Sequence, residues 1–263
     1  MKKFRNILLI VMTVMMTASC VEEMADPAYG EHELSFTASF DSDDDTKTIL
    51  VDGKDVHWLP GDCISVSGAS DAFVSDASAQ CAVTTFTGSA LPAETYFAVY
   101  PYESVVSWNG EVASVNVPAN QTAVKGTFSD DLNISASRAS SSDMNMSFHN
   151  VLGYMKFTIG EDSGSIRSVE VSAIGGESLA GAAEISYDSQ TGQPSLVSTT
   201  ESQTVTLSSE SALEPGDYYI AMIPGTYTEG LTLTFVATDY RVATKEIKTE
   251  LTLGKGVIQN IGT

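Results

Sequence analysis

Basic residues are scarce in this chain. Of its 263 residues, 13 are Lys or Arg and 34 are Asp or Glu, which gives a formal net charge of −21. Contacts to nucleic-acid phosphates need clustered Lys and Arg, and adhesion by charge to an anionic membrane surface needs them as well. The composition therefore argues against both kinds of partner. It does not indicate disorder, because 43% of the residues are hydrophobic and only 18% are charged.

Residues that carry chemistry are also few. The chain has three histidines, His32, His57 and His149, and none has a His or Cys neighbour at the spacing of a zinc site. The sequence motifs of serine hydrolases, zinc proteases and phosphate-binding loops do not occur. We therefore expect no enzymatic activity, no catalytic residue, no metal and no cofactor.

One acidic cluster has the composition of a calcium loop. It consists of Asp41, Asp43, Asp44 and Asp45, with Asp52 further along the chain. Thr46 stands where an EF-hand loop requires Gly, and the surrounding residues are typical of a hairpin. A solvated acidic loop is the better interpretation.

Long apolar runs are missing except at the N-terminus. Lys2, Lys3 and Arg5 precede the apolar residues 7–16, and small residues then lead to Cys20. This order is typical of a secretory signal, and the run is too short for a membrane-spanning helix of about 20 residues. A signal removed without lipid attachment and a buried helix are the alternatives. We predict a signal at residues 1–19 and a tether at residues 20–32.

The position of Cys20 directly after these small residues resembles a bacterial lipoprotein signal. The resemblance implies that Cys20 becomes the first mature residue and is acylated, and each buried methylene of an acyl chain contributes about 0.8 kcal/mol to membrane binding. Glu22, Glu23 and Asp26 follow closely, which is similar to the surface-export signal of Bacteroidales lipoproteins. The expected location is the outer membrane, facing outward, although an ordinary solvated tether would have the same composition.

Two further cysteines remain if Cys20 carries lipid. An oxidising location would permit a disulfide between Cys63 and Cys81, which would close a short loop and stabilise the fold by about 3 kcal/mol. Both residues lie in runs typical of strands, so two unpaired thiols are the alternative.

The rest of the chain has the pattern of β-strands. Apolar residues alternate with polar ones at residues 34–40, 113–117 and 231–235, and this period of two places one set of side chains on a buried face. Asp52-Gly53 is a hairpin signal. A convincing amphipathic helix is missing, although a short helix is an option near residues 70–80. The pattern predicts an all-β protein of antiparallel sandwiches.

An internal match suggests two related domains. Residues 92–101 (PAETYFAVYP) and 215–224 (PGDYYIAMIP) share both terminal prolines, a tyrosine and an alanine. Each run is apolar on both faces, as expected of a strand covered on two sides. A Ser-rich stretch at residues 135–143 precedes a new apolar run. We predict β-sandwich domains at residues 33–143 and 144–263, with chance similarity and a Ser-rich surface loop as the alternatives.

Two segments resemble a known family. Residues 46–53, followed by Val56 to Trp58 and then Gly61 to Val66, look like the opening of the fimbrillin-like proteins of Bacteroidales. Residues 146–157 resemble the start of that family's second domain. The resemblance implies two tandem transthyretin-like antiparallel β-sandwich domains after a lipoprotein signal peptide. It also implies a lipid-anchored surface protein that serves as a pilus subunit, anchor or tip, or as an adhesin.

Members of this family that form pili exchange a donor strand after a protease removes an N-terminal strand, usually behind Arg or Lys. Between Arg5 and Arg138 there is no Arg, so Lys47 and Lys54 are the only basic candidates for cleavage in this region. Residues 34–40 would suit the removed strand, because a partner strand can fill the apolar groove left behind. A permanent first strand is the favoured alternative.

Two other functions remain open at this stage. Surface aromatic residues could bind host or bacterial glycans, and the candidates are Tyr100, Tyr102, Trp108, Tyr227 and Tyr240. Alternatively, the chain could be a scaffold that presents a missing downstream domain.

Overall fold

The computed structural model describes residues 30–41, 57–200 and 202–263. Within these ranges the regular secondary structure is almost all β-strand, and the exceptions are two short 3-10 helices, η2 (Tyr102–Ser104) and η3 (Asp130–Leu132). The predicted all-β class is confirmed. The proposed signal, Cys20, Lys47, Lys54 and most of the acidic cluster lie outside the described residues.

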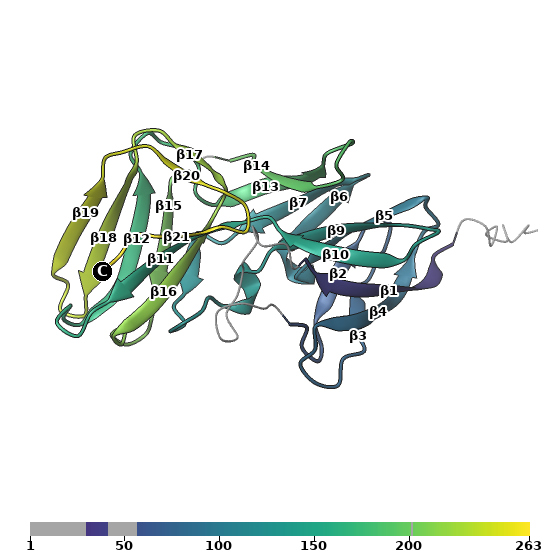
Figure 1. Ribbon diagram of the computed structural model, residues 1–263, viewed down its shortest axis with the longest axis horizontal. Helices are drawn as coiled ribbons and strands as arrows, with labels where there is room; N and C mark the ends of the chain where they lie inside the picture. The colour runs from purple at the N-terminus through teal and green to yellow at the C-terminus, as the bar shows by residue number, and fades with distance from the viewer. Residues whose placement is uncertain (1–29, 42–56, 201) are drawn as a thin grey trace, which may run out of the picture.

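Seven strands close into a ring at one end of the elongated molecule (Figure 1). In ring order they are β1 (His32–Phe40), β10 (Asn145–Asn150), β9 (Ser135–Ser140), β5 (Thr95–Tyr100), β2 (Cys63–Val66), β3 (Phe73–Ser75) and β4 (Val83–Ala90). The first strand is held on both sides, because β1 pairs with β4 in antiparallel and with β10 in parallel.

Aromatic side chains fill the ring. Trp58 is fully buried, and its Nε1 donates a hydrogen bond of 3.0 Å to the carbonyl of Ala38 on β1. The centroids of the aromatic groups of Phe40, Phe86 and Tyr100 lie 4.1, 4.9 and 5.2 Å from the centroid of the Trp58 indole. Along β1 and β4 buried side chains alternate with more exposed ones, as the period of two predicts.

A four-stranded sheet covers the outer face of β5 and β9. Its order is β14 (Pro194–Ser198), β13 (Gly181–Tyr187), β7 (Val112–Val117) and β6 (Val105–Asn109). Tyr187 of β13 donates hydrogen bonds to the carbonyls of Ala98 and Ser137, at 3.2 and 2.8 Å, and its ring packs on Phe97. Strand β5 is therefore buried on both faces, as its apolar sequence indicates.

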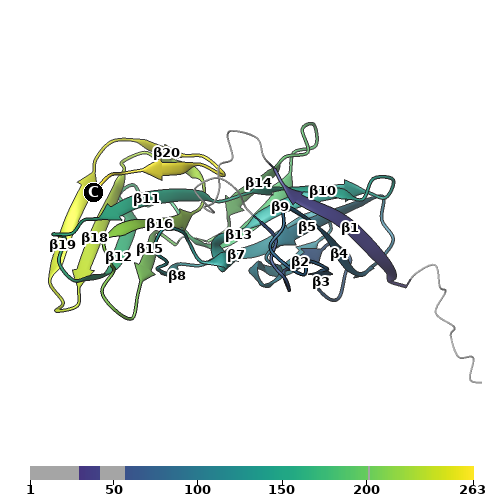
Figure 2. The same ribbon diagram turned by 60° about the horizontal axis from the view of Figure 1, so that its bottom comes forward.

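The remaining strands form three sheets around a second core (Figure 2). The five-stranded sheet has the order β19 (Val242–Ile247), β18 (Leu231–Ala237), β12 (Ile166–Ala173), β15 (Thr204–Ser208) and β8 (Asn120–Thr122). The three-stranded sheet has the order β16 (Gly216–Met222), β11 (Gly153–Ile159) and β21 (Ile258–Asn260), and β17 (Gly225–Tyr227) pairs with β20 (Leu251–Leu253).

Both matching sequences form strands, but these strands differ in position, since β5 lies between β9 and β2 and β16 lies at the end of its sheet. Residues 92–101 contain β5 and residues 215–224 contain β16, and both strands are mostly buried.

Pairing is antiparallel in most ladders, and the parallel exceptions among the described strands are β1 with β10, β11 with β21 and β15 with β8.

Strand pairing crosses the predicted boundary near residue 144 at several places. Strand β10 follows that boundary but completes the ring, while β7 pairs with β13 and β8 with β15. The second core also takes residues from both sides, from Val99 to Leu253. That residues 33–143 and 144–263 are two separate domains therefore stays a prediction.

The short helix considered near residues 70–80 is wrong. That segment contains β3, in which Phe73 and Ser75 are buried and Val74 between them is exposed. The side chains therefore follow a period of two, and β3 pairs with β2 and β4.

Candidate binding cleft

A tight hairpin projects strand β6 beside the ring. Strands β6 and β7 pair up to Asn109 and Val112, which leaves the two-residue loop Gly110-Glu111. Gly110 has a φ of +61°, and a glycine at the first loop position is what a type II′ turn requires. The turn fixes the register, and the register sets which β6 side chains face the ring.

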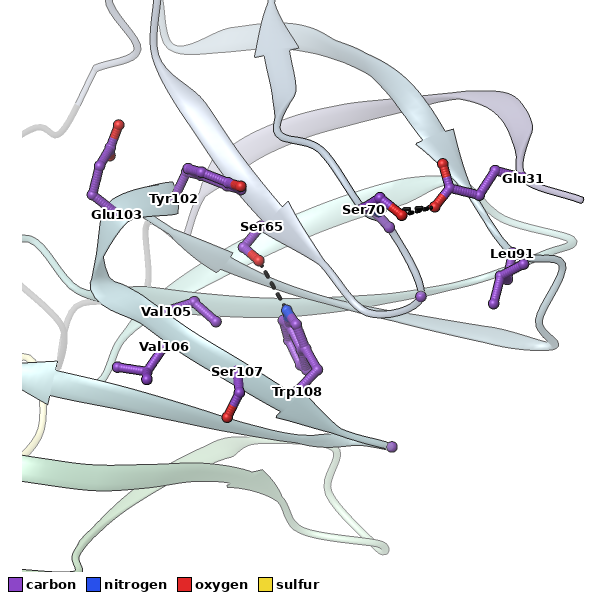
Figure 3. A pocket seen from close by; sticks show the side chains of 13 residues that line it. Glu31, Ser65, Ser70, Leu91, Tyr102, Glu103, Val105, Val106, Ser107 and Trp108 are labelled. Atoms are coloured by element: carbon purple, nitrogen blue, oxygen red, sulfur yellow. Dashed lines mark hydrogen bonds between the residues drawn. The ribbon is translucent and has the colours of Figure 1, made fainter.

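A cleft of about 750 Å³ lies between this hairpin and the end of the ring (Figure 3). Strand β6 and η2 form one wall, with Tyr102, Val106 and Trp108 among its residues. The opposite wall contains Glu31 and Leu91. The volume is within the range of pockets that hold small ligands.

Trp108 is held in a defined orientation in the cleft. Its Nε1 donates a hydrogen bond of 2.8 Å to Oγ of Ser65, which is itself buried on β2 (Figure 3). The indole also packs against the second core while it lines the cleft. A half-buried ring with its polar edge satisfied presents the rest of its surface as a rigid platform.

The opposite wall is ordered by a carboxylate. Glu31 Oε1 accepts hydrogen bonds from the backbone N–H of Ser70 at 2.9 Å and from its hydroxyl at 2.6 Å. The backbone N–H of Leu91 donates to the carbonyl of Gly68 at 2.9 Å. These contacts connect the start of β1, the turn after β2 and the end of β4 into one surface.

The electrostatic character of the cleft is acidic. Its lining includes the carboxylates of Glu31 and Glu103, and among the described residues that line it none is Lys, Arg or His. Hydroxyl groups of Ser65, Ser70 and Tyr102 add further polar atoms. The site can accept and donate hydrogen bonds, but it offers no counter-charge to an anion.

A second hollow of about 500 Å³ also borders η2 and shares Glu103 with the cleft. It is lined by Asp62, Glu103, Asp130 and Asp131, among others. Burial raises the pKa of the Asp62 carboxyl, and the negative charges of Asp130 and Glu103 raise it further. Over the described part of the chain, no group of three or more His, Cys, Asp or Glu side chains is arranged to hold a metal.

The three histidines have separate surroundings. His32 is exposed at the start of β1, and Nδ1 of His57 lies 2.8 Å from Nε2 of Gln80. Nδ1 of His149 lies 2.8 Å from Oδ2 of Asp41, the one member of the acidic cluster that the structure describes. The contact joins β10 to the residue that follows β1.

Of the two alternatives for Cys63 and Cys81, a disulfide or two unpaired thiols, the structure has two free thiols. Their backbones face different partners, since Cys63 pairs with Val74 and Cys81 bridges to Trp58. The Cys63 thiol donates to the carbonyl of Gly61, and burial raises its pKa.

The candidate aromatic residues do not form one platform. Tyr100 and Tyr227 are buried, and the Tyr100 hydroxyl donates to Asp62. Tyr240 is 74% exposed but stands at the turn between β18 and β19, beside Arg167. Only Tyr102 and Trp108 of the five line the cleft.

The sequence did not reveal the residues that complete the cleft. Two of them, Glu31 and Ser65, are far from Trp108 in the sequence and come close to it only through the fold. The other two, Glu103 and Val106, are near Trp108 in the sequence but belong to no recognisable motif. One available signal was Gly110-Glu111, since Gly at the first position of a two-residue loop favours a type II′ hairpin, which carries Trp108 close to its turn.

Solved structures of Bacteroides proteins share this architecture. A "putative cell adhesion protein" from Bacteroides ovatus ATCC 8483 is matched with a TM-score of 0.54 at 12% identity, over 89% of this chain and 92% of that one. A second one, from Bacteroides uniformis ATCC 8492, is matched with a TM-score of 0.50 at 19% identity, over 88% and 92%.

The chain has the fold of these two proteins. The tip fimbrial protein Mfa3 from Porphyromonas gingivalis, with a C-terminal truncation, is matched more weakly, with a TM-score of 0.36 at 9% identity over 83% of this chain and 82% of that one. No protein-family model and no curated protein matches the sequence. No helix among the described residues is long and apolar enough to cross a membrane.

Proposed function

We propose that this chain is a fimbrillin-like adhesion protein of the cell surface, anchored in the outer membrane through acylated Cys20. The observation that carries the proposal is the fold, which the chain shares over most of its length with a Bacteroides protein described in terms of cell adhesion. The N-terminal sequence supports the anchor, since a short apolar run and small residues lead directly to Cys20.

The cleft supports adhesion as the working role. An adhesin needs a preformed surface for its ligand, and the walls of the cleft are ordered by the Trp108–Ser65 and Glu31–Ser70 hydrogen bonds. A catalytic role has less support, because the described lining of the cleft contains no His, Lys or Cys, and the Ser70 hydroxyl and the Glu31 carboxylate are bonded to each other. Adhesion therefore explains the site better than catalysis does.

The pairing of strand β1 helps to distinguish an adhesin or anchor from a pilus subunit that polymerises. It is paired on both edges and buries Phe36 and Ala38 completely. Its removal would expose apolar surface and two rows of unpaired backbone groups. Donor-strand exchange would need a partner strand to replace all of these contacts. We propose that β1 stays in place as a permanent first strand, and hence an adhesin or anchor in preference to a subunit that polymerises after cleavage at Lys47 or Lys54.

Cell fractionation tests the anchor. The wild-type protein should be in the outer-membrane fraction and accessible to protease added to intact cells, and Cys20→Ala should release it into the soluble fraction. Cells that lack the protein should attach less well to a host-cell layer. A wild-type protein that is soluble without detergent would contradict the anchor, and unchanged attachment would contradict the adhesive role.

A further inference from the structure

The cleft beside β6 combines features that select one class of ligand. It presents two aromatic side chains, Tyr102 and Trp108, together with the carboxylate of Glu103 and several hydroxyl groups. We infer that the cleft binds a neutral carbohydrate, with Tyr102 and Trp108 contacting sugar rings and Glu103 accepting hydrogen bonds from sugar hydroxyls. This inference rests on the proposed adhesive function and names its ligand class.

The aromatic side chains supply the apolar part of the contact. A sugar ring has one face rich in C–H groups, and the face of an aromatic ring is electron-rich and attracts them. Trp108 is suited to this because its N–H is already bonded to Ser65, so the indole cannot rotate freely. In Figure 3, Tyr102 lies above Val105, and Trp108 lies to the right of Val105 and below Ser65.

The polar groups supply the directional part of the contact. Glu103 is exposed at the rim next to Tyr102, and Ser107 is exposed on β6. Across the opening, Glu31 is oriented by its two hydrogen bonds with Ser70. Carboxylates accept hydrogen bonds from sugar hydroxyls, which are good donors.

The charge of the cleft selects among carbohydrates. Two carboxylates line it, and none of its described lining residues is cationic. A sialylated or sulfated glycan would bring its own negative charge next to Glu31 and Glu103 without a counter-charge. Such juxtaposition is unfavourable, so neutral sugars are preferred over anionic ones.

The shape of β6 disfavours a peptide that would add to it as a new strand. The ladder between β6 and β7 shifts register between Val105 and Ser107, which is the mark of a β-bulge. Bulges at an edge disrupt the regular row of backbone groups that a further strand needs. Val106 at this bulge is 72% exposed.

The two tryptophans of the chain provide a direct readout. Trp58 is fully buried in the ring and bonded to Ala38, whereas Trp108 lines the cleft. A ¹H–¹⁵N NMR spectrum of the mature protein with the lipid site changed, Cys20→Ala, should therefore show two indole N–H signals. The probes are lactose, N-acetyllactosamine, cellobiose and mannobiose, with 3′-sialyllactose as the anionic comparison.

At least one neutral probe, at concentrations up to about 10 mM, should shift the Trp108 signal and leave the Trp58 signal in place. Tyr102→Ala should weaken that binding at least tenfold, and the isosteric Glu103→Gln should weaken it measurably. Tyr240→Ala, a remote exposed tyrosine, should change it by less than twofold. An unchanged position of the Trp58 signal in each variant would show that the variant is folded.

Four results would overturn the inference. The first two are a Trp108 signal that no neutral probe shifts, and a Trp108 signal that only 3′-sialyllactose shifts. The other two are equal losses of sugar affinity in Tyr102→Ala and Tyr240→Ala, and a sugar affinity that neither Tyr102→Ala nor Glu103→Gln lowers. Because the experiment uses soluble protein, its failure would leave the surface anchor and the attachment of cells untouched, and those are tested separately.

Discussion

At the scale of single residues, Trp58 joins β1 to the interior of the ring. Its indole is fully buried, bonded to the carbonyl of Ala38 and packed on Phe40 at a centroid distance of 4.1 Å. Trp58→Phe should lower the free energy of unfolding by about 1–3 kcal/mol, because it leaves a cavity and a carbonyl without this donor. Urea unfolding measures the loss, and an unchanged midpoint would contradict the assigned role.

Gln121 is a second residue with a specific structural task. Strand β16 lies at the end of its sheet, and there the Gln121 side chain accepts from the N–H of Ala221 at 3.0 Å and donates to its carbonyl at 2.7 Å. The amide thus replaces a neighbouring strand at one position.

Gln121→Ala would leave both buried backbone groups unpaired. We expect the free energy of unfolding to fall by more than about 2 kcal/mol, since each such group costs about 1–3 kcal/mol. The exposed Gln203 is the matched control, and Gln203→Ala should change stability by less than about 0.5 kcal/mol. Equal effects of the two substitutions in urea unfolding would refute the proposed task.

At the scale of elements, a charge pair links β11 to β16. Nζ of Lys156 lies 2.7 Å from Oδ2 of Asp217, and the hydroxyl of Thr158 donates to Oδ1. The hydrogen bonds from Lys156 and Thr158 lower the pKa of Asp217, and the bond to Asp217 raises the pKa of Lys156.

These two pKa shifts predict how the stability of the fold depends on pH. The ionised Asp217 stabilises the fold above the pKa of an unfolded aspartate, about 3.9, and this contribution disappears as the pH falls through the lower folded value. The contribution of Lys156 is present below about pH 10.4 and disappears as the pH rises through its raised folded value. The gap between the urea midpoints of wild type and Asp217→Asn should therefore narrow below about pH 4. A gap that stays constant from neutral to acid pH would contradict the electrostatic origin.

Elements with strict alternation were predictable from sequence, and those set by distant pairing were not. Residues 34–40 alternate clearly and form most of β1. The segment near residues 70–80 was ambiguous, because β3 is only three residues long and takes its conformation from β2 and β4. Parallel pairing of β1 with β10 was likewise not deducible, because no local turn specifies which strand lies beside another.

At the scale of the whole molecule, cross-boundary pairing gives a prediction about fragments. A chain that ends at residue 143 lacks β10, so β1 and β9 each lose a neighbour, and the face covered by Tyr187 is exposed. We expect this fragment to lack a cooperative thermal transition that the complete chain shows. A cooperative transition and a dispersed NMR spectrum for the fragment would instead indicate an independent domain.

The cleft is likewise a property of the whole chain. Tyr102 and Trp108 were predictable as candidate sugar-binding residues from their aromatic character, but Tyr100 and Tyr227 had the same character and are buried. Tyr100 and Tyr227 belong to the two cores, whereas Tyr102 and Trp108 lie on η2 and on β6 at the edge of the four-stranded sheet, and this placement depends on the tertiary fold.

Attachment of cells that display cleft variants tests the central claim most directly. The claim is that a surface-anchored adhesion protein binds its ligand in the cleft beside β6. Cells carrying Tyr102→Ala should attach to a host-cell layer as poorly as cells without the protein, whereas cells carrying Tyr240→Ala should attach like wild type, at equal surface amounts of protein. Full attachment by the Tyr102→Ala cells would contradict the claim.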